Sequence, residues 1–225
     1  MFAGRNISVT HAAMAASRVM ATCAVLGQAA GTAAHIAAAK KISPKMVGNY
    51  IRELQKILMD DDCWLPGLKR EISESCKGAD LYAECGNADN LRNGIDRPTD
   101  ADGDNGCYIK KGSKITYSFK SPTYISSVRI IFDSDLNRET VTGGIPQVKD
   151  CPTICNRPLN MTPFTFPATM TRVFKLIADG EIIYETASNH QRLVRIDVNK
   201  SVKIVELQPT ETYGSDKVHI FSFDF

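Results

Sequence analysis

The sequence lacks a clear excess of either charge. It has 27 Lys and Arg residues against 25 Asp and Glu residues, a formal net charge of +2 over 225 residues. A surface that binds nucleic acid usually shows a clustered basic excess. The charge balance therefore argues against a nucleic-acid partner, while 43% hydrophobic and 23% charged residues are typical of a folded rather than a disordered chain.

Cysteine motifs are also missing. Seven cysteines are too few for a secreted disulfide scaffold of this length, and none form the C-x-x-C pair of a zinc or redox site. The closest spacing is the C-x-x-x-C of Cys151 and Cys155. We therefore expect mostly inert thiols and a reducing, cytoplasmic location.

Long, strongly apolar runs are absent too. Residues 19–39 carry no Asp, Glu, Lys or Arg, but they are mostly Ala, Gly and Thr. This composition is poor for a membrane span, and no compact apolar region of a signal peptide follows Arg5 or Arg18. With 13 alanines between Ala12 and Ala39, the segment instead predicts a buried helix of a soluble protein, without a membrane partner.

The composition changes near residue 66. A second helix is expected after Ser43-Pro44 and before the break at Pro66-Gly67. Its apolar stripe comprises Val47, Ile51, Leu54, Ile57 and Leu58. We therefore expect a helical segment over residues 1–67 and a separate domain over residues 73–225.

The second domain shows the period-two alternation of strands. Apolar residues alternate around residues 115–119, 128–132 and 194–198, and residues 202–207 and 217–225 predict two more strands. Asp179-Gly180 predicts the two-residue turn of a hairpin over residues 174–185. Because no helical pattern separates the strands, the fold class expected is α+β, with an antiparallel β-sandwich after the helices.

The first stretch that suggests chemistry is Gly4-Arg5-Asn6, which precedes the alanine-rich helix with Gly27 and Gly31. Glycine lets the backbone approach a ligand closely, and a helix N-terminus offers free N–H groups to anions. Glycines in a helix also serve as close-packing positions. The residue types alone are therefore compatible with a ligand-binding role and with a close-packing role.

Longer stretches carry a family resemblance. MFAGRNISVTHAAMAASRVMATCAVLGQAAGTAA at the N-terminus resembles the C-terminal end of the flavin-binding domain in a bacterial family of FAD-dependent oxidoreductases. DDDCWLPG (60–67) continues it, and NGIDRP (93–98), FDSDLNRE (132–139) and NHQRLVRI (189–196) resemble that family's C-terminal, galactose-binding-like (jelly-roll) sandwich.

The resemblance implies FAD as cofactor and a small-molecule substrate. The residues that it implies near the cofactor are Gly4, Arg5 and Asn6 at the diphosphate and ribityl chain, Leu26, Gly27 and Gln28 at the ribityl or ring, Gly31 beside them, and Arg18 at a phosphate or the substrate. His11 is the candidate catalytic proton-transfer group, because histidine serves as acid or base near neutral pH. The alternative is a histidine bonded to backbone at a helix start.

One hallmark of such enzymes is absent. No G-x-G-x-x-G turn occurs in the 225 residues, although dinucleotide-binding domains open on one. We therefore expect a truncated or C-terminal fragment whose FAD site is incomplete. Any iron–sulfur cluster would belong to the missing part, because no cysteine run has ferredoxin spacing.

Two features of the second domain suggest other ligands. Asp100, Asp102 and Asp104 alternate around a glycine as in a Ca²⁺ loop, although the run is not an EF-hand and could be a solvated acidic turn. Five aromatic residues could stack on sugar rings or fill the core: Tyr108, Tyr124, Phe164, Phe166 and Tyr213. The alternative function is therefore a carbohydrate- or protein-binding sandwich without catalysis of its own.

Overall fold

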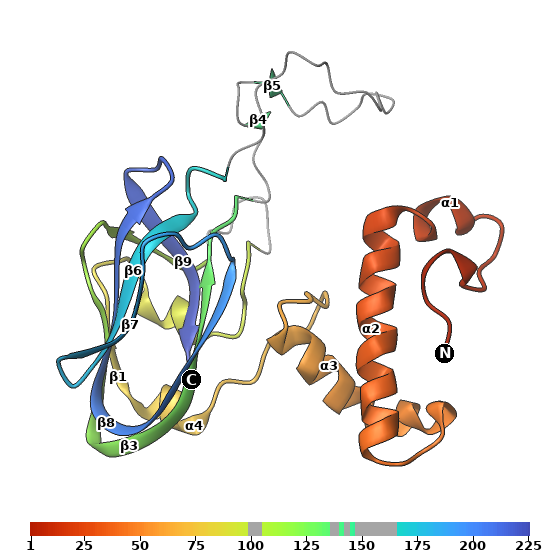
Figure 1. Cartoon of the computed structure of the whole chain (residues 1–225), viewed down its shortest axis with the longest axis horizontal. Coiled ribbons are helices and arrows are strands. Elements are labelled where there is room, and N and C mark those ends of the chain that lie inside the picture. Colours follow the sequence, from red (N-terminus) through yellow and green to blue (C-terminus); the bar gives the residue numbers. More distant parts are fainter. Residues whose placement is uncertain (99–104, 136–139, 142–144, 147–165) are drawn as a thin grey trace. The chain divides into compact units, whose positions relative to one another are not determined.

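A computed structural model describes residues 1–98, 105–135, 140–141, 145–146 and 166–225. The chain forms two compact units, Met1–Glu71 and Ile72–Phe225. The first is helical and the second is built mainly from strands (Figure 1). Each unit is described by itself.

The N-terminal unit begins with the 3₁₀ turn η1 (Gly4–Asn6) and the short helix α1 (Met14–Ser17). The alanine-rich segment continues as α2 (Met20–Ala39), followed by the 3₁₀ helix η2 (Pro44–Tyr50) and by α3 (Ile51–Asp60). A small apolar core joins the last turns of α2 to η2. It consists of Ala33, Ile36, Ala37 and Val47.

The prediction that residues 19–39 form a buried helix is wrong for the first half of that helix. Val19, Met20 and Val25 are 53%, 90% and 51% exposed, because the unit's core covers only the C-terminal turns of α2. The predicted stripe also fails at Ile51, which is 48% exposed. The 3₁₀ geometry of η2 turns through three residues rather than 3.6, which shifts Ile51 out of phase with Val47.

The second unit contains an antiparallel sheet of seven strands among its described residues. In chain order these are β1 (Asp80–Tyr82), β2 (Cys107–Lys110), β3 (Ile115–Phe132), β6 (Thr171–Ala178), β7 (Glu181–Thr186), β8 (Leu193–Thr212) and β9 (Lys217–Asp224). Helix α4 (Glu74–Gly78) and the 3₁₀ helix η3 (Ala88–Arg92) precede β2. Two short strands, β4 (Thr140–Val141) and β5 (Ile145–Pro146), pair with each other.

Two long strands organise the sheet, whose order is β2-β9-β3-β8-β6-β7. β3 pairs with β8 from Ile115 opposite Leu207 to Ile131 opposite Leu193. Its other edge pairs first with β1 and then with β9. The predicted α+β class, with helices followed by an antiparallel sandwich, is confirmed.

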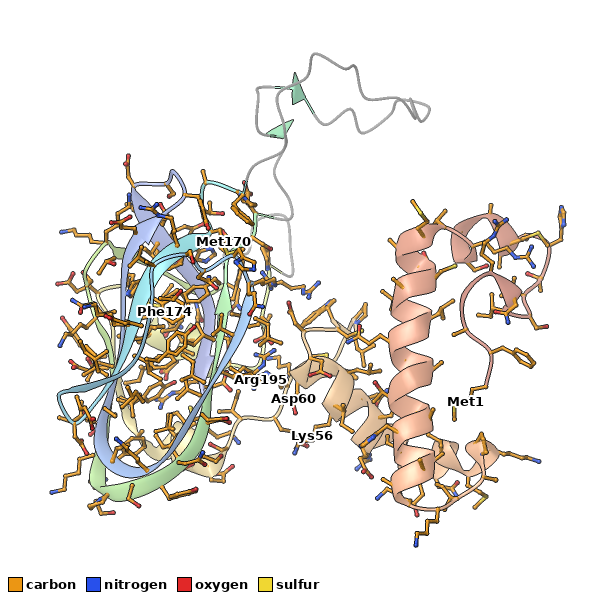
Figure 2. All side chains as sticks on the ribbon, viewed as in Figure 1. Met1, Lys56, Asp60, Met170, Phe174 and Arg195 are labelled. Carbon is orange, nitrogen blue, oxygen red and sulfur yellow. A yellow bond between two sulfur atoms is a disulfide. The ribbon has the colours of Figure 1, made fainter. Side chains whose placement is uncertain are left out.

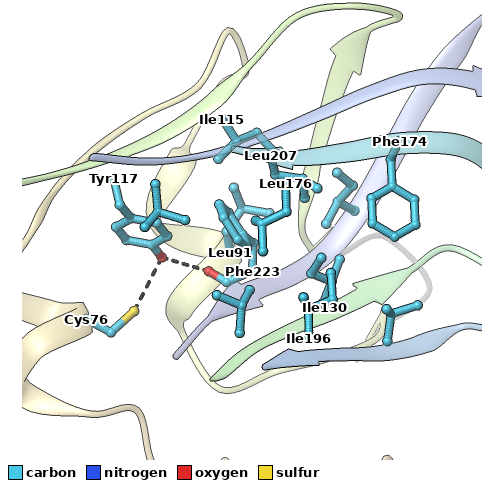
Figure 3. Close-up of a cluster of buried hydrophobic side chains, with 14 of the residues drawn as sticks. Cys76, Leu91, Ile115, Tyr117, Ile130, Phe174, Leu176, Ile196, Leu207 and Phe223 are labelled. Atoms are coloured by element: carbon cyan, nitrogen blue, oxygen red, sulfur yellow. Dashed lines mark hydrogen bonds between the residues drawn. The ribbon is translucent and has the colours of Figure 1, made fainter. Parts of the chain in front are cut away.

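The core of the second unit lies between these curved strands (Figure 3). Tyr117 is fully buried, and its hydroxyl donates to the Phe223 carbonyl at 2.8 Å and accepts from the Cys76 thiol at 3.4 Å. Burial raises the pKa of both the Cys76 thiol and the Tyr117 phenol. Both groups therefore stay uncharged and serve as core packing.

The predicted hairpin is confirmed, with Asp179 and Gly180 between β6 and β7. Both turn residues have positive φ, 48° and 85°, as a type I′ turn requires. The Asp179 carboxylate accepts the N–H groups of Lys203 and Ile204. Figure 2 draws the side chains of the unit and labels Phe174 on β6 and Met170 just before it.

A disulfide joins Cys85 to Cys107 across 22 positions of sequence. The cysteine spacing gave no sign of this pair, because the two sulfurs meet only when β2 enters the sheet. Cys23 and Cys76 form no disulfide within the described residues. Within the described ranges, no helix has both the length and the apolar character needed to cross a membrane.

Candidate functional site

The Gly4–Asn6 turn packs against α2 in the N-terminal unit. Gly4 has φ of +83°, and no atom lies within 4 Å of the position that a Cβ would occupy. Glycine is required there by the backbone conformation, and the space beside it is open. Arg5 and Asn6 are exposed at the same turn. The turn can therefore admit a ligand close to its backbone.

Arg18 connects α1 to α2 and is half-buried. Its Nε is buried and has no hydrogen-bond partner among the residues that the structure describes. A buried N–H without a partner costs about 1–3 kcal/mol. Next to Arg18, α2 starts without a side-chain cap on Val19 and without an acidic residue in its first turn. The free N–H groups at the start of α2 and the Arg18 guanidinium, which precedes them in the sequence, are both donors of the kind that an anionic group accepts.

The predicted residues of α2 lie on two different faces. Leu26 is half-buried and lies seven residues before buried Ala33, on the side that leads into the core. Gly27, Gln28 and Gly31 are exposed, and no atom lies within 4 Å of a Cβ built on either glycine. A flat ligand could therefore approach the glycine face closely, whereas Leu26 would support the helix from the other side.

His11 lies in the turn before α1 and is exposed. Its backbone carbonyl accepts the Met14 N–H at 3.2 Å, which closes the first turn of the helix. The structure thus places the backbone of His11 at a helix start. Its catalytic role stays a prediction.

In the second unit, three of the segments that carried the family resemblance converge. Arg192 donates through one Nη to the Phe132 carbonyl at 3.2 Å and through the other to the Asp96 carbonyl. The Asp96 carboxylate pairs with Arg129 at 2.9 Å, and both side chains are almost fully buried. A buried pair of this kind holds the segment around Asp96 against β3.

His219 joins a second buried pair to this cluster. Its Nδ1 lies 3.0 Å from an Asp133 carboxylate oxygen and its Nε2 lies 2.9 Å from the Asn105 carbonyl. Burial acts to raise the pKa of Asp133. Hydrogen bonds from His219 and the Asp135 N–H, with the charges of His219 and Arg192, outweigh that effect and lower it below its usual value.

The predicted aromatic residues have different surroundings. Tyr108 stacks on His219, with ring centroids 3.9 Å apart, and Tyr124 is 60% exposed on β3. Phe166 is 46% exposed, and its ring centroid lies 4.7 Å from that of Tyr213 and 5.9 Å from that of His190. Phe164 lies outside the described residues. Phe166, Tyr213 and His190 form an aromatic cluster that is partly open to solvent, named here the Phe166 cluster.

The predicted calcium ligands Asp100, Asp102 and Asp104 lie outside the described residues. Among the residues that are described, no group of three or more His, Cys, Asp or Glu side chains is arranged to hold a metal ion. The calcium prediction therefore remains a prediction.

Sequence reasoning missed the buried polar side chains of Arg129, Asp133 and His219. One signal was present, since Arg129 and His219 each interrupt a run of apolar strand residues. A polar side chain inside such a run must find a partner, because a buried polar group without a hydrogen bond is costly. That Asp133 is the partner of His219 could not be predicted from the sequence, because the two residues are 86 positions apart.

Comparison with known proteins relates the N-terminal unit to a flavoprotein family. Residues 1–58 match the family model described as FAD dependent oxidoreductase. A comparison with curated proteins finds no match.

Comparison with solved structures concerns the sandwich. The family 32 carbohydrate-binding module of Streptococcus pneumoniae EndoD is 11% identical, with a TM-score of 0.43, over 65% of this chain and 94% of that one. The CBM32-1 module of a Clostridium perfringens family 31 glycoside hydrolase is 10% identical, with a TM-score of 0.37, over 67% and 96%. The N-terminal domain of the repair protein XRCC1 is 12% identical, with a TM-score of 0.35, over 72% and 99%.

Proposed function

We propose that this chain supplies the flavin-proximal end of an FAD-dependent oxidoreductase, to which a β-sandwich is attached. The match of residues 1–58 to that family supports the proposal. The single structural observation that carries it is the buried Nε of Arg18, which lacks a partner in the described chain, beside the uncapped start of α2. A phosphate of the cofactor would satisfy both.

The residues present fit the cofactor in three further ways. Gly4 leaves open space at a turn that packs on α2, and Arg5 adds a positive charge for the diphosphate. Gly27 and Gly31 present backbone without side chains to a flat ring. Bound FAD would accept a hydride equivalent from a small-molecule substrate. The chain's own part would be to bind and orient it, with His11 as the group to hold or release a proton.

The test is the flavin content of the native protein. We would isolate the protein from its source cells with an antibody against residues 72–225 and record its visible absorption spectrum. We expect flavin to accompany it, and Arg18→Gln to reduce the flavin content severalfold while Lys45→Gln, an exposed change in the same unit, leaves it intact. Native protein without flavin would refute the proposal.

A second candidate function concerns the sandwich alone. The Phe166 cluster is an exposed aromatic surface, and sugars bind by stacking their apolar faces on such rings. We propose that a carbohydrate is the ligand of this surface. A glycan-binding screen of the full chain tests it: Phe166→Ala should abolish binding, and Tyr124→Ala, which removes an exposed ring elsewhere, should not. If both variants bind as well as the wild-type chain, or if the chain binds no glycan, this candidate function is wrong.

A further inference from the structure

A cavity of about 300 Å³ lies within the N-terminal unit, apart from the residues assigned above to the flavin. One wall is a face of α3, which presents Arg52, Gln55, Lys56 and Met59 at steps of three and four residues. The opposite wall is the segment Leu68–Glu71, and all the lining residues come from this one unit. Figure 2 shows Lys56 on α3.

The charge of the lining is strongly one-sided. Arg52, Lys56 and Lys69 contribute three cations at the exposed part of the lining, against the single carboxylate of Glu71, while the Arg70 side chain is buried. The Glu71 carboxylate pairs with Lys56 at 3.3 Å, and both side chains are mostly exposed, so the pair is weak. Cations brought together from two segments repel one another unless an anion lies between them.

The cavity also has an apolar part. Met59 and Leu68 line it, and Met59 is held in place because its sulfur accepts the Leu65 N–H at 3.3 Å. The volume is at the lower end of that of small-molecule sites. Arginine matches phosphate oxygens with two parallel hydrogen bonds, and lysine adds a point charge.

We propose that this cavity binds a small phosphorylated molecule, with the phosphate held by Arg52 and Lys69 and a short apolar group against Leu68. The Glu71 carboxylate competes with the phosphate for Lys56. Removing the charge of Glu71 therefore strengthens the binding of the phosphate. The inference is independent of the flavin site, which involves other residues.

Calorimetric titration of the full chain at low, constant ionic strength tests it, with inorganic phosphate and phenyl phosphate as probes. We expect saturable binding of both, tighter for phenyl phosphate. Arg52→Glu or Lys69→Glu should weaken binding about tenfold, the equivalent of one charge-assisted contact. Glu71→Gln should strengthen the binding of both probes. Leu68→Ala should weaken the binding of phenyl phosphate but not that of inorganic phosphate.

The matched control is Lys45→Glu, an exposed charge reversal in the same unit but outside the cavity lining. Thermal melts of every variant verify folding. The proposal is overturned if the heats do not saturate, if Lys45→Glu weakens binding as much as Arg52→Glu does, or if Glu71→Gln leaves the affinity unchanged. None of these results depends on whether the native protein carries flavin.

Discussion

The Asp133 carboxylate helps to hold the segment before β2 through its contact with His219. His219 lies between the Asp133 carboxylate and the Asn105 carbonyl, and both of these oxygens accept hydrogen bonds. The ring also stacks on Tyr108. Protonation of Asp133 would remove the negative charge from its contact with His219.

This geometry gives a pH dependence with a definite sign. The pKa of Asp133 is lower in the folded chain than the value near 3.9 of an unfolded aspartate. The ionised carboxylate therefore contributes stability above that unfolded value, and the contribution is lost as the pH falls through the folded pKa. Asp133→Asn should remove this part of the acid sensitivity and lower the free energy of unfolding at neutral pH by about 1–3 kcal/mol.

Urea unfolding over a series of acidic to neutral pH values measures both effects. Asp197→Asn serves as the control, because Asp197 is exposed on β8. Acid sensitivity that is as steep in Asp133→Asn as in the wild-type chain would contradict the argument.

At the scale of elements, the β6–β7 hairpin depends on the backbone conformation of Gly180. Its φ is +85°, and no atom lies within 4 Å of a Cβ built there. Gly180→Ala should therefore destabilise the sandwich only through backbone strain, by about 1 kcal/mol. Gly86→Ala is the matched control, since Gly86 has equally open space without a positive φ. Equal urea midpoints for the two variants would show that the turn tolerates a side chain.

The strands show what sequence patterns could and could not predict. Alternation located the two ends of β3, because side chains on a half-buried strand repeat every two residues. The hairpin was located by its Asp179-Gly180 turn. Alternation did not show that residues 194–198 and 202–207 belong to one strand, β8, since Asn199 turns the backbone with φ of 50° between them. Local periodicity carries no information across such an interruption.

The candidate site was predictable to a different degree. Gly27 and Gly31, named from the sequence, are four residues apart on α2, and the structure leaves both exposed. The unpartnered Nε of Arg18 could not be predicted, because it depends on how α1 joins α2. The charged cavity was missed for the same reason, since Leu68–Glu71 must fold back along α3 to form it.

On the scale of the whole molecule, the two units have separate cores of very different size. The core cluster of the N-terminal unit has only four buried residues within the described chain, whereas the sandwich buries a large apolar cluster that includes Tyr117, Phe132 and Phe174. Stability from burial grows with the apolar area removed from water. We therefore expect the helical unit to unfold first and separately, before the sandwich, in a thermal or urea transition followed by circular dichroism.

The disulfide makes this expectation selective, because Cys85 and Cys107 both belong to the sandwich. Opening a loop of this length should destabilise that unit by about 3 kcal/mol, since the unfolded chain regains the freedom that the cross-link removed. Reductant should therefore lower the midpoint of the second transition, that of the sandwich, and leave the midpoint of the first transition unchanged. Replacement of both cysteines by alanine should make the second transition insensitive to reductant. A single transition that shifts as a whole would mean instead that the two units stabilise each other, and that the sandwich belongs to the folding unit of the flavin-proximal helices.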